Sequence, residues 1–331
     1  MRIAIDAMGT DSAPGPEVAG ALLALHELPS DTHIVLVGDE GAVRTELSRH
    51  TDTPPERLHL VHAPERILPG EAPTQAFRKK PHSSIALGLR LLKERQADAF
   101  VSAGSTGAVM AGSLLTLRPL PGVDRPAIGT LLPTADRPVL MLDAGANVDC
   151  RPAHLVQFAR LGHIYAQDLM GIEHPRVGLL NIGEEEEKGN EVAVETHRLL
   201  RESGLNFVGN VEGSDLIHGR CDVFVCDGFV GNVLLKFYES VAAFIAQLLR
   251  RQAEAVLKEL DLEPVFRVLD YAEYGGAPLL GVNGVSVICH GRSPPKAILN
   301  AIKLAARAVE TDMVGDMARE LADGAPSGEE R

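Results

Sequence analysis

The segment Ser102-Ala-Gly-Ser-Thr-Gly107 has the residue types of an anion-binding loop. An apolar run leads into it and a helical pattern leaves it, and Gly104 and Gly107 let a ligand approach the backbone closely. Free N–H groups at the helix start, together with the hydroxyls of Ser105 and Thr106, favour a phosphate or a carboxylate. The chain has no GxxxxGK[ST] and this segment is not GxGxxG, so neither a Walker loop nor a dinucleotide is indicated.

Five further segments rich in glycine and polar residues also follow apolar runs. They are Asp6–Asp11, Asp143–Asp149, Asn181–Asn190, Cys226–Asn232 and His290–Ser293. A tight turn between a strand and a helix needs glycine in any case, so each segment alone fits a purely structural turn as well as a ligand-binding loop. Ligands bind at the carboxyl ends of parallel strands, and six such segments on one sheet would meet at one edge. We therefore expect a single site at that edge.

Lys188 follows four glutamates and is flanked by Gly183 and by Gly189-Asn190. One interpretation is a solvated charged loop. The other is a lysine that swings into a cleft and neutralises an anion. In either case Asn190 is suited to cap a helix that starts at the next residue.

Asp227, Asn232 and His290 are polar residues at the ends of predicted strands. Asp227 follows an apolar run, where an unpaired carboxylate is costly, so we expect it to have a partner, either Lys188 or His290. A buried structural hydrogen bond is the alternative for each of the three residues.

Several familiar sites are missing from the sequence. It contains no HExxH, and His59-x-x-His62 fits the alternation of a strand. It contains no GxSxG nucleophile elbow, and Cys226 fits a buried core cysteine better than a nucleophile. We expect neither a metal nor a cofactor.

The elements that must position these residues alternate between strand and helix patterns. The expected strands are Arg2–Asp6, His33–Gly38, Leu58–His62, Ala99–Ser102, Ala127–Leu132, Val139–Asp143, Val177–Ile182, Val223–Cys226 and Val285–Cys289. The expected helices are Pro16–Glu27, Ser83–Arg95, Thr106–Leu117, Pro152–Met170, Glu191–Ser203, Gly231–Lys258 and Pro295–Glu310. This alternation predicts a layered α/β/α fold with a mostly parallel sheet. We expect one α/β catalytic domain over residues 1–322, with a helical arm at about 231–274 and a frayed polar tail at 323–331.

Composition limits the classes of partner. The 331 residues are 45% hydrophobic and 23% charged, as in a soluble globular protein, and the net charge of −13 argues against nucleic acid. The four cysteines are widely spaced, the start has no leader pattern, and the longest apolar candidate for a span, Val241–Leu249, is too short. We expect a reduced, cytoplasmic protein.

The order of the motifs also resembles a known family. The motifs are Asp6-Ala-Met-Gly9, Ser102–Gly107, Asp143–Asp149, Asn181-Ile-Gly-Glu184, Lys188-Gly-Asn-Glu191, Cys226–Asn232, Tyr274-Gly-Gly-Ala277 and His290-Gly291. From residue 1 to about residue 310 the chain resembles the acyl-acyl carrier protein:phosphate acyltransferases of bacterial phospholipid synthesis. It departs from the family pattern at Thr10, where a second glycine is usual, at Ser105, where asparagine is usual, and at Val230, where threonine is usual.

The resemblance implies transfer of a long-chain acyl group from the thioester of acyl carrier protein to inorganic phosphate. It also implies a fold similar to isocitrate/isopropylmalate dehydrogenase and phosphotransacetylase, and a homodimer. The acyl phosphate would pass to a membrane glycerol-3-phosphate acyltransferase, so loose peripheral membrane association is expected.

This chemistry suggests a role for each candidate residue. Lys188 would counter the charge of phosphate or oxyanion, Asp227 would orient Lys188 or His290, and Asn232 would donate to the oxyanion or phosphate. His290 would assist the leaving thiol, and its role and that of Lys188 are interchangeable. The expected phosphate ligands are Ser102, Gly104, Ser105, Thr106 and Gly107, and the expected further substrate contacts are Asp6, Gly9, Asn147 and Gly183.

Three other functions remain open at this point: a phosphotransacetylase using acyl-CoA, a metal-dependent hydroxyacid dehydrogenase, and a non-catalytic scaffold that binds carrier protein. The basic clusters available to an acidic carrier are Arg78-Lys79-Lys80 and Arg250-Arg251. The apolar run in 231–260 would line an acyl pocket, form a dimer seam or touch a bilayer.

Overall fold

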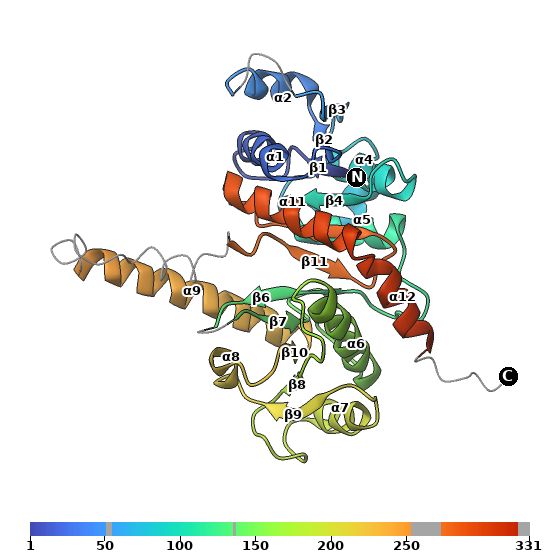
Figure 1. Ribbon diagram of the computed structural model, residues 1–331, viewed down its shortest axis with the longest axis vertical. Helices are drawn as coiled ribbons and strands as arrows, with labels where there is room; N and C mark the ends of the chain where they lie inside the picture. The colour runs from blue at the N-terminus through green and yellow to red at the C-terminus, as the bar shows by residue number, and fades with distance from the viewer. Residues whose placement is uncertain (51–54, 135–136, 253–272, 324–331) are drawn as a thin grey trace. The chain divides into compact units, whose positions relative to one another are not determined.

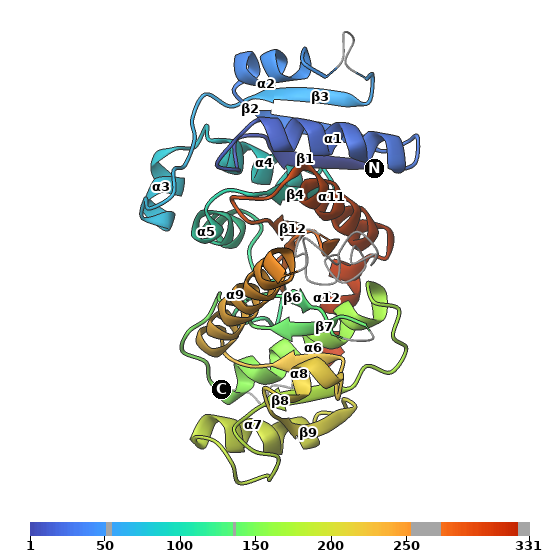
Figure 2. The same cartoon turned by 90° about the vertical axis from the view of Figure 1, so that its left-hand side faces the viewer.

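The computed structural model describes residues 1–50, 55–134, 137–252 and 273–323, and within the helix at 228–252 it leaves out the side chains of 246 and 249–252. The chain forms two compact units, residues 1–126 with 275–331, and residues 127–274. Each unit is built around its own largely parallel sheet (Figures 1 and 2). The expectation of one sheet is therefore wrong, and where we expected one α/β domain over 1–322 the contacts give two units.

The first unit contains a sheet with the strand order β3-β2-β1-β4-β12-β11-β5. The strands are β1 (Arg2–Asp6), β2 (His33–Gly38), β3 (Leu58–His62), β4 (Ala99–Ser102), β11 (Ala277–Leu280) and β12 (Val285–Ile288). The last strand of the sheet, β5 (Ala127–Ile128), has residues that are grouped with the second unit. From β3 to β12 all neighbours are parallel, whereas β11 runs antiparallel to β12. The carboxyl ends of β1, β4 and β12 therefore share one edge.

Helices cover both faces of this sheet because its central strands are apolar on both sides. β1 and β4 are buried almost throughout. The helices of the unit are α1 (Gly15–Glu27), α2 (Glu40–Leu47), α3 (Pro73–Lys79), α4 (Ser84–Lys93), α5 (Thr106–Thr116), α11 (Pro295–Glu310) and α12 (Met313–Asp323). Figure 1 shows α1 and α11 on one side of β1 and β4, and α4 and α5 on the other. The layered α/β/α arrangement is confirmed for this unit.

The second unit has the strand order β6-β7-β10-β8-β9. Its strands are β6 (Thr130–Leu132), β7 (Val139–Leu142), β8 (Val177–Leu180), β9 (Phe207–Val211) and β10 (Val223–Val225), and its helices are α6 (Pro152–Asp168), α7 (Glu191–Arg201), α8 (Asp215–His218) and α9 (Gly228–Gln252). β7, β10, β8 and β9 are parallel, and β6 is antiparallel to β7. Phe158 and Tyr165 of α6 are fully buried in this unit.

The sequence pattern predicted most elements to within a few residues and missed the short ones. The missed elements are α2, α3, α8, α12, β9 and β11. The expected strand Ala127–Leu132 is two strands, β5 and β6, which belong to different sheets. A continuous apolar run cannot show such a change of sheet, because both short strands need the same buried residue types.

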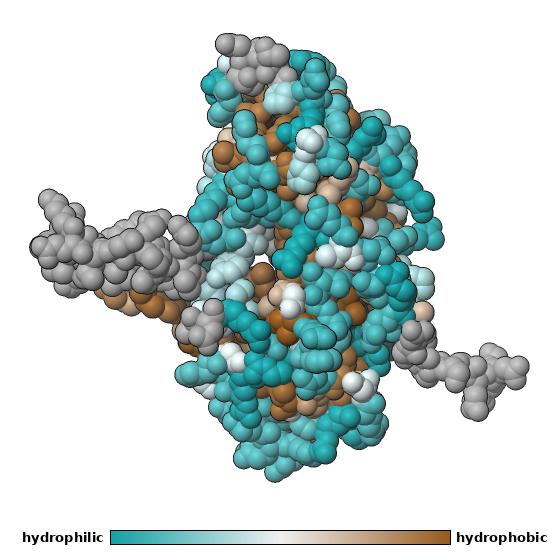
Figure 3. Space-filling view, viewed as in Figure 1, coloured by the Kyte–Doolittle hydropathy of each residue, from teal (hydrophilic) through white to brown (hydrophobic). Residues whose placement is uncertain are grey.

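The expected arm begins with α9, three residues earlier than predicted, and residues 253–272 of the arm lie outside the described residues. Within α9 the apolar side chains of Phe229, Val233, Phe237 and Phe244 are exposed. Figure 3 shows apolar surface on the part of this helix that is visible in the view. By length and composition alone Gly228–Ile245 could cross a membrane, whereas from the sequence we expected no stretch long enough and took Val241–Leu249 as the longest candidate. The expected tail starts at the last residue of α12, and residues 324–331 are likewise not described.

Candidate active site

At the carboxyl-end edge of the sheet in the first unit, a side-chain hydrogen bond joins the ends of β1 and β4. The Ser102 hydroxyl donates to Asp6 Oδ2 at 2.7 Å, and the Met8 N–H donates to Asp6 Oδ1 at 3.0 Å. Burial raises the pKa of the Asp6 carboxyl, while hydrogen bonds, among them one from Ser102, and the charge of Arg66 act in the opposite direction. Asp6 is 1% exposed, so we assign it to holding the ends of β1 and β4 in place and not to direct contact with a ligand.

The segment Ser102–Gly107, the predicted anion cradle, forms the turn between β4 and α5. Ser102 Oγ also accepts the Gly104 N–H at 3.0 Å, which folds the turn back on the strand end. α5 starts at Thr106, and its N-cap residue Ser105 makes no side-chain capping hydrogen bond. The first-turn N–H groups of α5 therefore point out of the helix without a cap, as an anion site requires.

The glycines of this edge have different roles. A Cβ on Gly9 would lie 2.8 Å from the backbone nitrogens of Ala103 and Gly104, so glycine lets loop 6–11 lie directly on the cradle. A Cβ on Gly107 would lie 2.7 Å from Pro73 Cγ. We expected Gly107 to make room for a ligand, but in the structure it makes room for α3.

A buried carboxyl fixes loop 6–11 from the side of α1. Thr10 N–H donates to Glu17 Oε1 at 2.6 Å, and the Thr10 hydroxyl donates to Glu17 Oε2 at 3.0 Å. Arg66 Nη2 donates to the Thr10 carbonyl at 2.8 Å. Burial raises the pKa of Glu17 to about 7, against the effect of the Thr10 hydrogen bonds. Thr10, which departs from the family pattern, is thus the residue that Glu17 holds.

Sequence reasoning missed Glu17 and Arg66. A signal for Glu17 was present, because it shares the apolar face of α1 with Val18, Ala21 and Ala24. Arg66 follows β3 in an irregular segment, and nothing in the sequence marks it.

His290 follows β12 at the same edge. Its Nδ1 accepts the Arg292 N–H at 3.1 Å, and the Asp11 N–H donates to the Gly291 carbonyl at 2.7 Å. Since Nδ1 accepts a hydrogen bond, the neutral imidazole carries its proton on Nε2. The side chain is exposed at this edge.

The second unit presents another edge, at the carboxyl ends of β7, β10 and β8. Asp143 follows β7 and is fully buried. Its carboxylate accepts the Asn147 N–H at 2.6 Å and the Asn147 side-chain amide at 2.9 Å. Burial raises the pKa of Asp143, and these hydrogen bonds oppose the rise. Asn147, expected to bind substrate, is 8% exposed and directs its amide toward its own loop.

Asp227 and Asn232 lie at the start of α9. Asp227 Oδ1 accepts the Val230 N–H at 2.8 Å, which caps the helix. The Gly228 N–H donates to the Asn147 carbonyl at 2.7 Å, so the helix start is fixed to the Asp143 loop. A Cβ on Gly145 would lie 3.4 Å from Asn232 Cβ, which places Asn232 beside that loop.

Lys188 lies in the connection between β8 and α7. Its side chain crosses Gly183, where a Cβ would lie 3.0 Å from Lys188 Cγ, and its Nζ is 4.0 Å from Glu185 Oε2. The side chain is 46% exposed. Asn190 caps α7 through the Ala193 N–H at 2.9 Å, as predicted.

The expected pairing of Asp227 with Lys188 is not found. In the described part of this unit Asp227 bonds to the start of its own helix, and the ion-pair partner of Lys188 is Glu185. The two residues nevertheless follow neighbouring parallel strands, β10 and β8. A helix cap satisfies a carboxylate as well as a lysine does, which the sequence pattern could not distinguish.

The structure thus divides the predicted site residues between two sheet edges. Asp6, Gly9, the cradle and His290 belong to the first unit, and Asn147, Gly183, Lys188, Asp227 and Asn232 belong to the second. Cys226 is buried, and burial raises its pKa well above the usual value, so it is unsuited to act as a nucleophile. Among the described residues no group of three or more His, Cys, Asp or Glu side chains is placed to hold a metal.

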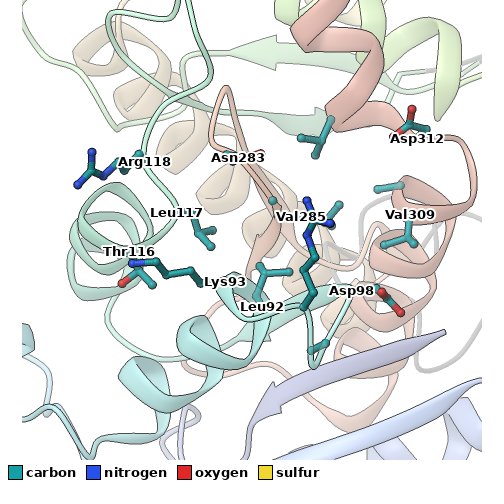
Figure 4. Close-up of a pocket in the computed structure, with 15 residues that line it drawn as sticks. Leu92, Lys93, Asp98, Thr116, Leu117, Arg118, Asn283, Val285, Val309 and Asp312 are labelled. Atoms are coloured by element: carbon teal, nitrogen blue, oxygen red, sulfur yellow. The ribbon is translucent and has the colours of Figure 1, made fainter.

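A cavity of about 490 Å³ in the first unit lies away from the cradle. Asp98 and Val285, at the amino ends of β4 and β12, line it, whereas the cradle follows the carboxyl end of β4. Figure 4 shows Lys93 and Arg118 among the side chains that line it. The cavity therefore belongs to the opposite edge of the sheet.

Known proteins resemble this chain over nearly its full length. Residues 1–315 match the family model of fatty acid synthesis proteins. The phosphate acyltransferase of Desulforamulus reducens is 51% identical over 321 residues, covering 95% of each chain, and that of Nostoc sp. is 50% identical over 326 residues, covering 95% of this chain and 94% of the relative.

Solved structures share the fold at low sequence identity. A phosphotransacetylase from Staphylococcus aureus superposes with a TM-score of 0.59 at 16% identity, covering 93% of this chain and 94% of that one. A 4-hydroxythreonine-4-phosphate dehydrogenase from Klebsiella pneumoniae has a TM-score of 0.54 at 14% identity, covering 93% of this chain and 99% of that one. With a family model matched over residues 1–315 and relatives near 50% identity, the chain belongs to the family of fatty acid synthesis proteins.

Proposed function

We propose that this protein is a phosphate acyltransferase that moves a long-chain acyl group from the thioester of acyl carrier protein to inorganic phosphate. The observation that carries the proposal is the uncapped start of α5 behind Ser102–Gly107, in a chain about half identical to phosphate acyltransferases. The acyl phosphate product serves phosphatidic acid and phospholipid synthesis.

The reaction needs orientation and charge stabilisation more than base catalysis. A phosphate oxygen attacks the thioester carbonyl carbon, a C–O bond forms, and the carbonyl oxygen takes up negative charge. The C–S bond then breaks, and the thiolate leaves and accepts a proton. Phosphate is already anionic and a thiol has a pKa of about 8.5, so neither nucleophile nor leaving group requires strong activation. Correct positioning supplies about 7–11 kcal/mol of the barrier reduction.

The residues of the first unit suit the nucleophile and the leaving group. The first-turn N–H groups of α5, with the Ser105 and Thr106 hydroxyls, hold phosphate, while Ser102 and Gly104 shape the loop. Asp6 and Gly9 position this loop. His290 assists the leaving group by donating a hydrogen bond from its Nε2–H to the thiolate, which takes its proton from water, and the Nδ1 hydrogen bond orients the ring for this role.

The residues of the second unit suit the developing negative charge. Lys188 is long and partly exposed, and its ion pair among the described residues spans 4.0 Å, so we expect it to reach a substrate anion. Asn232 donates to the oxyanion or phosphate. Asp227 acts by fixing the start of α9, on which Asn232 stands, and Gly183 and Asn147 shape the neighbouring loops.

The remaining partners follow the same function. The protein is proposed to be a cytoplasmic homodimer with peripheral membrane contact, passing acyl phosphate to a membrane glycerol-3-phosphate acyltransferase. The exposed apolar residues of α9 suit an acyl pocket, a dimer seam or a bilayer surface. The proposed fold class is that of isocitrate/isopropylmalate dehydrogenase.

Phosphate-dependent conversion of purified acyl-acyl carrier protein to acyl phosphate tests the proposal. We expect free carrier and acyl phosphate in equal amounts, and neither without phosphate. Acetyl-CoA as the preferred donor would indicate a phosphotransacetylase instead. Binding of carrier protein without phosphate-dependent release would indicate a scaffold.

A further inference from the structure

Helix α3 packs on the start of α5 with one face and exposes a basic face. A Cβ on Gly107 would contact Pro73, and a Cβ on Gly112 would lie 2.5 Å from the Phe77 ring, so Pro73 and Phe77 face α5. Figure 2 shows α3 beside α5. Arg78 and Lys79, in the last turn of α3, are exposed.

A third cation joins this face from α4. Arg90 Nη2 donates to the Pro81 carbonyl at 3.2 Å, which places its guanidinium at the connection between α3 and α4. Within the described ranges neither Arg78, Lys79 nor Arg90 forms an ion pair, so these charges face solvent uncompensated.

Two acidic residues near this face are already engaged. Glu71 pairs with Lys80 Nζ at 2.5 Å, and Glu65 accepts the His82 N–H at 2.9 Å. Lys80 also donates to the Arg66 carbonyl at 2.9 Å, so the charge of the third member of the predicted cluster Arg78-Lys79-Lys80 is already paired.

The chain has a net charge of −13, and elsewhere on its surface arginines are paired with acidic side chains, unlike the cations of this face. Arg198 pairs with both Glu195 and Glu202, and Arg44 pairs with Glu40. The outer face of α3 is thus a local positive surface on an acidic protein. Such a surface attracts an acidic partner and fixes its orientation.

We propose that Arg78, Lys79 and Arg90 form the docking surface for the acidic carrier protein, an inference that rests on the proposed function. The surface adjoins the cradle because Pro73 of the same helix contacts Gly107 in the first turn of α5. A carrier seated there keeps its folded part outside the site, while the flexible arm bearing the thioester reaches the phosphate. Arg250-Arg251, the other predicted cluster, has side chains outside the described set.

The test compares two double charge reversals in the full-length protein. Arg78→Glu/Lys79→Glu alters the proposed surface. Lys93→Glu/Arg307→Glu is the control, because both residues are also exposed, lie in the last turn of a helix of the same unit and form no ion pair in the described part of the chain. KM is measured for the acyl carrier thioester at saturating phosphate, for phosphate at saturating thioester, and for an acyl-pantetheine thioester without carrier protein. Thermal melting checks that each variant is folded.

We expect the first variant to raise KM for the carrier thioester at least about fivefold, with KM for phosphate and for acyl-pantetheine unchanged. The salt dependence of kcat/KM with the carrier should weaken in parallel, and Arg78→Gln/Lys79→Gln, which only removes charge, should give a smaller shift in the same direction. If the control variant raises KM for the carrier thioester as much as Arg78→Glu/Lys79→Glu does, the proposed docking surface is wrong. It is also wrong if Arg78→Glu/Lys79→Glu raises KM for phosphate as much as KM for the carrier thioester. If the unmodified protein makes no acyl phosphate from any thioester, the proposed function itself has failed.

Discussion

Thr10 donates both its backbone N–H and its hydroxyl to the carboxylate of Glu17, which is fully buried. The loop that carries Thr10 also carries Gly9, whose bare Cα lets the loop lie on the backbone of Ala103 and Gly104. A buried acid in α1 therefore determines where the β1 loop meets the phosphate cradle.

The protonation state of Glu17 makes the free energy of unfolding depend on pH. Burial raises its pKa from 4.5 to about 7, so between these values the folded protein binds more protons than the unfolded chain. The contribution of Glu17 to stability is therefore full below pH 4.5 and is lost as pH rises through about 7. Glu17→Gln keeps the shape of the side chain but does not ionise. Between pH 5 and pH 8 its free energy of unfolding should therefore rise relative to that of the unmodified protein by up to about 3 kcal/mol. Urea unfolding at the two pH values measures this difference. A difference that stays constant with pH would show that Glu17 does not titrate in this range.

The bond between Ser102 and Asp6 predicts a change in phosphate affinity. Ser102→Ala removes a donor to a buried carboxylate and an acceptor for the Gly104 N–H, so it should cost about 1–3 kcal/mol of stability. KM for phosphate should rise while KM for the thioester stays the same, as steady-state kinetics would show. Ser113→Ala is the control, since Ser113 pairs with Ser286 inside the same unit at 3.2 Å. An unchanged KM for phosphate in Ser102→Ala would remove this hydroxyl from the cradle.

A methyl group at position 9 should displace the β1 loop. In Gly9→Ala the new Cβ would lie 2.8 Å from two backbone nitrogens, which cannot move without shifting the cradle. We expect a loss of about 1–3 kcal/mol in stability and weaker phosphate binding by isothermal titration calorimetry. Gly15→Ala, where the nearest atom would be 3.7 Å away, should leave both unchanged. Equal behaviour of the two variants would contradict the close approach at Gly9.

Lys188 should affect activity far more than stability. Its ion pair with Glu185 is 4.0 Å long and exposed, and such pairs contribute about 0–1 kcal/mol. Lys188→Ala should lower kcat about 10²–10³-fold, as expected for loss of one group that stabilises the developing charge. Melting temperature and the rate of acyl phosphate formation are the two measurements. Glu185→Gln, which breaks the same pair from the other side, should retain activity. Normal turnover by Lys188→Ala would exclude the lysine from the reaction.

The sequence by itself determined the local structure and the residue types of the site. Apolar runs such as Arg2–Asp6 and Ala99–Ser102 became central strands because burial on both faces leaves little freedom in composition. The Ser102–Gly107 loop and the Asn190 helix cap followed from short-range hydrogen bonding, which neighbouring residues dictate.

Only the tertiary structure decided which strand ends share a sheet and which side chains meet. The pairing of Ser102 with Asp6 spans 96 positions, and the division of the strands into two sheets turns on the short stretch between β5 and β6. Long-range pairing depends on the packing of whole elements, and neither the period of a strand nor the composition of a turn encodes it. For the same reason we expected Lys188 or His290 as the partner of Asp227, whereas its carboxylate accepts the Val230 N–H in the first turn of α9.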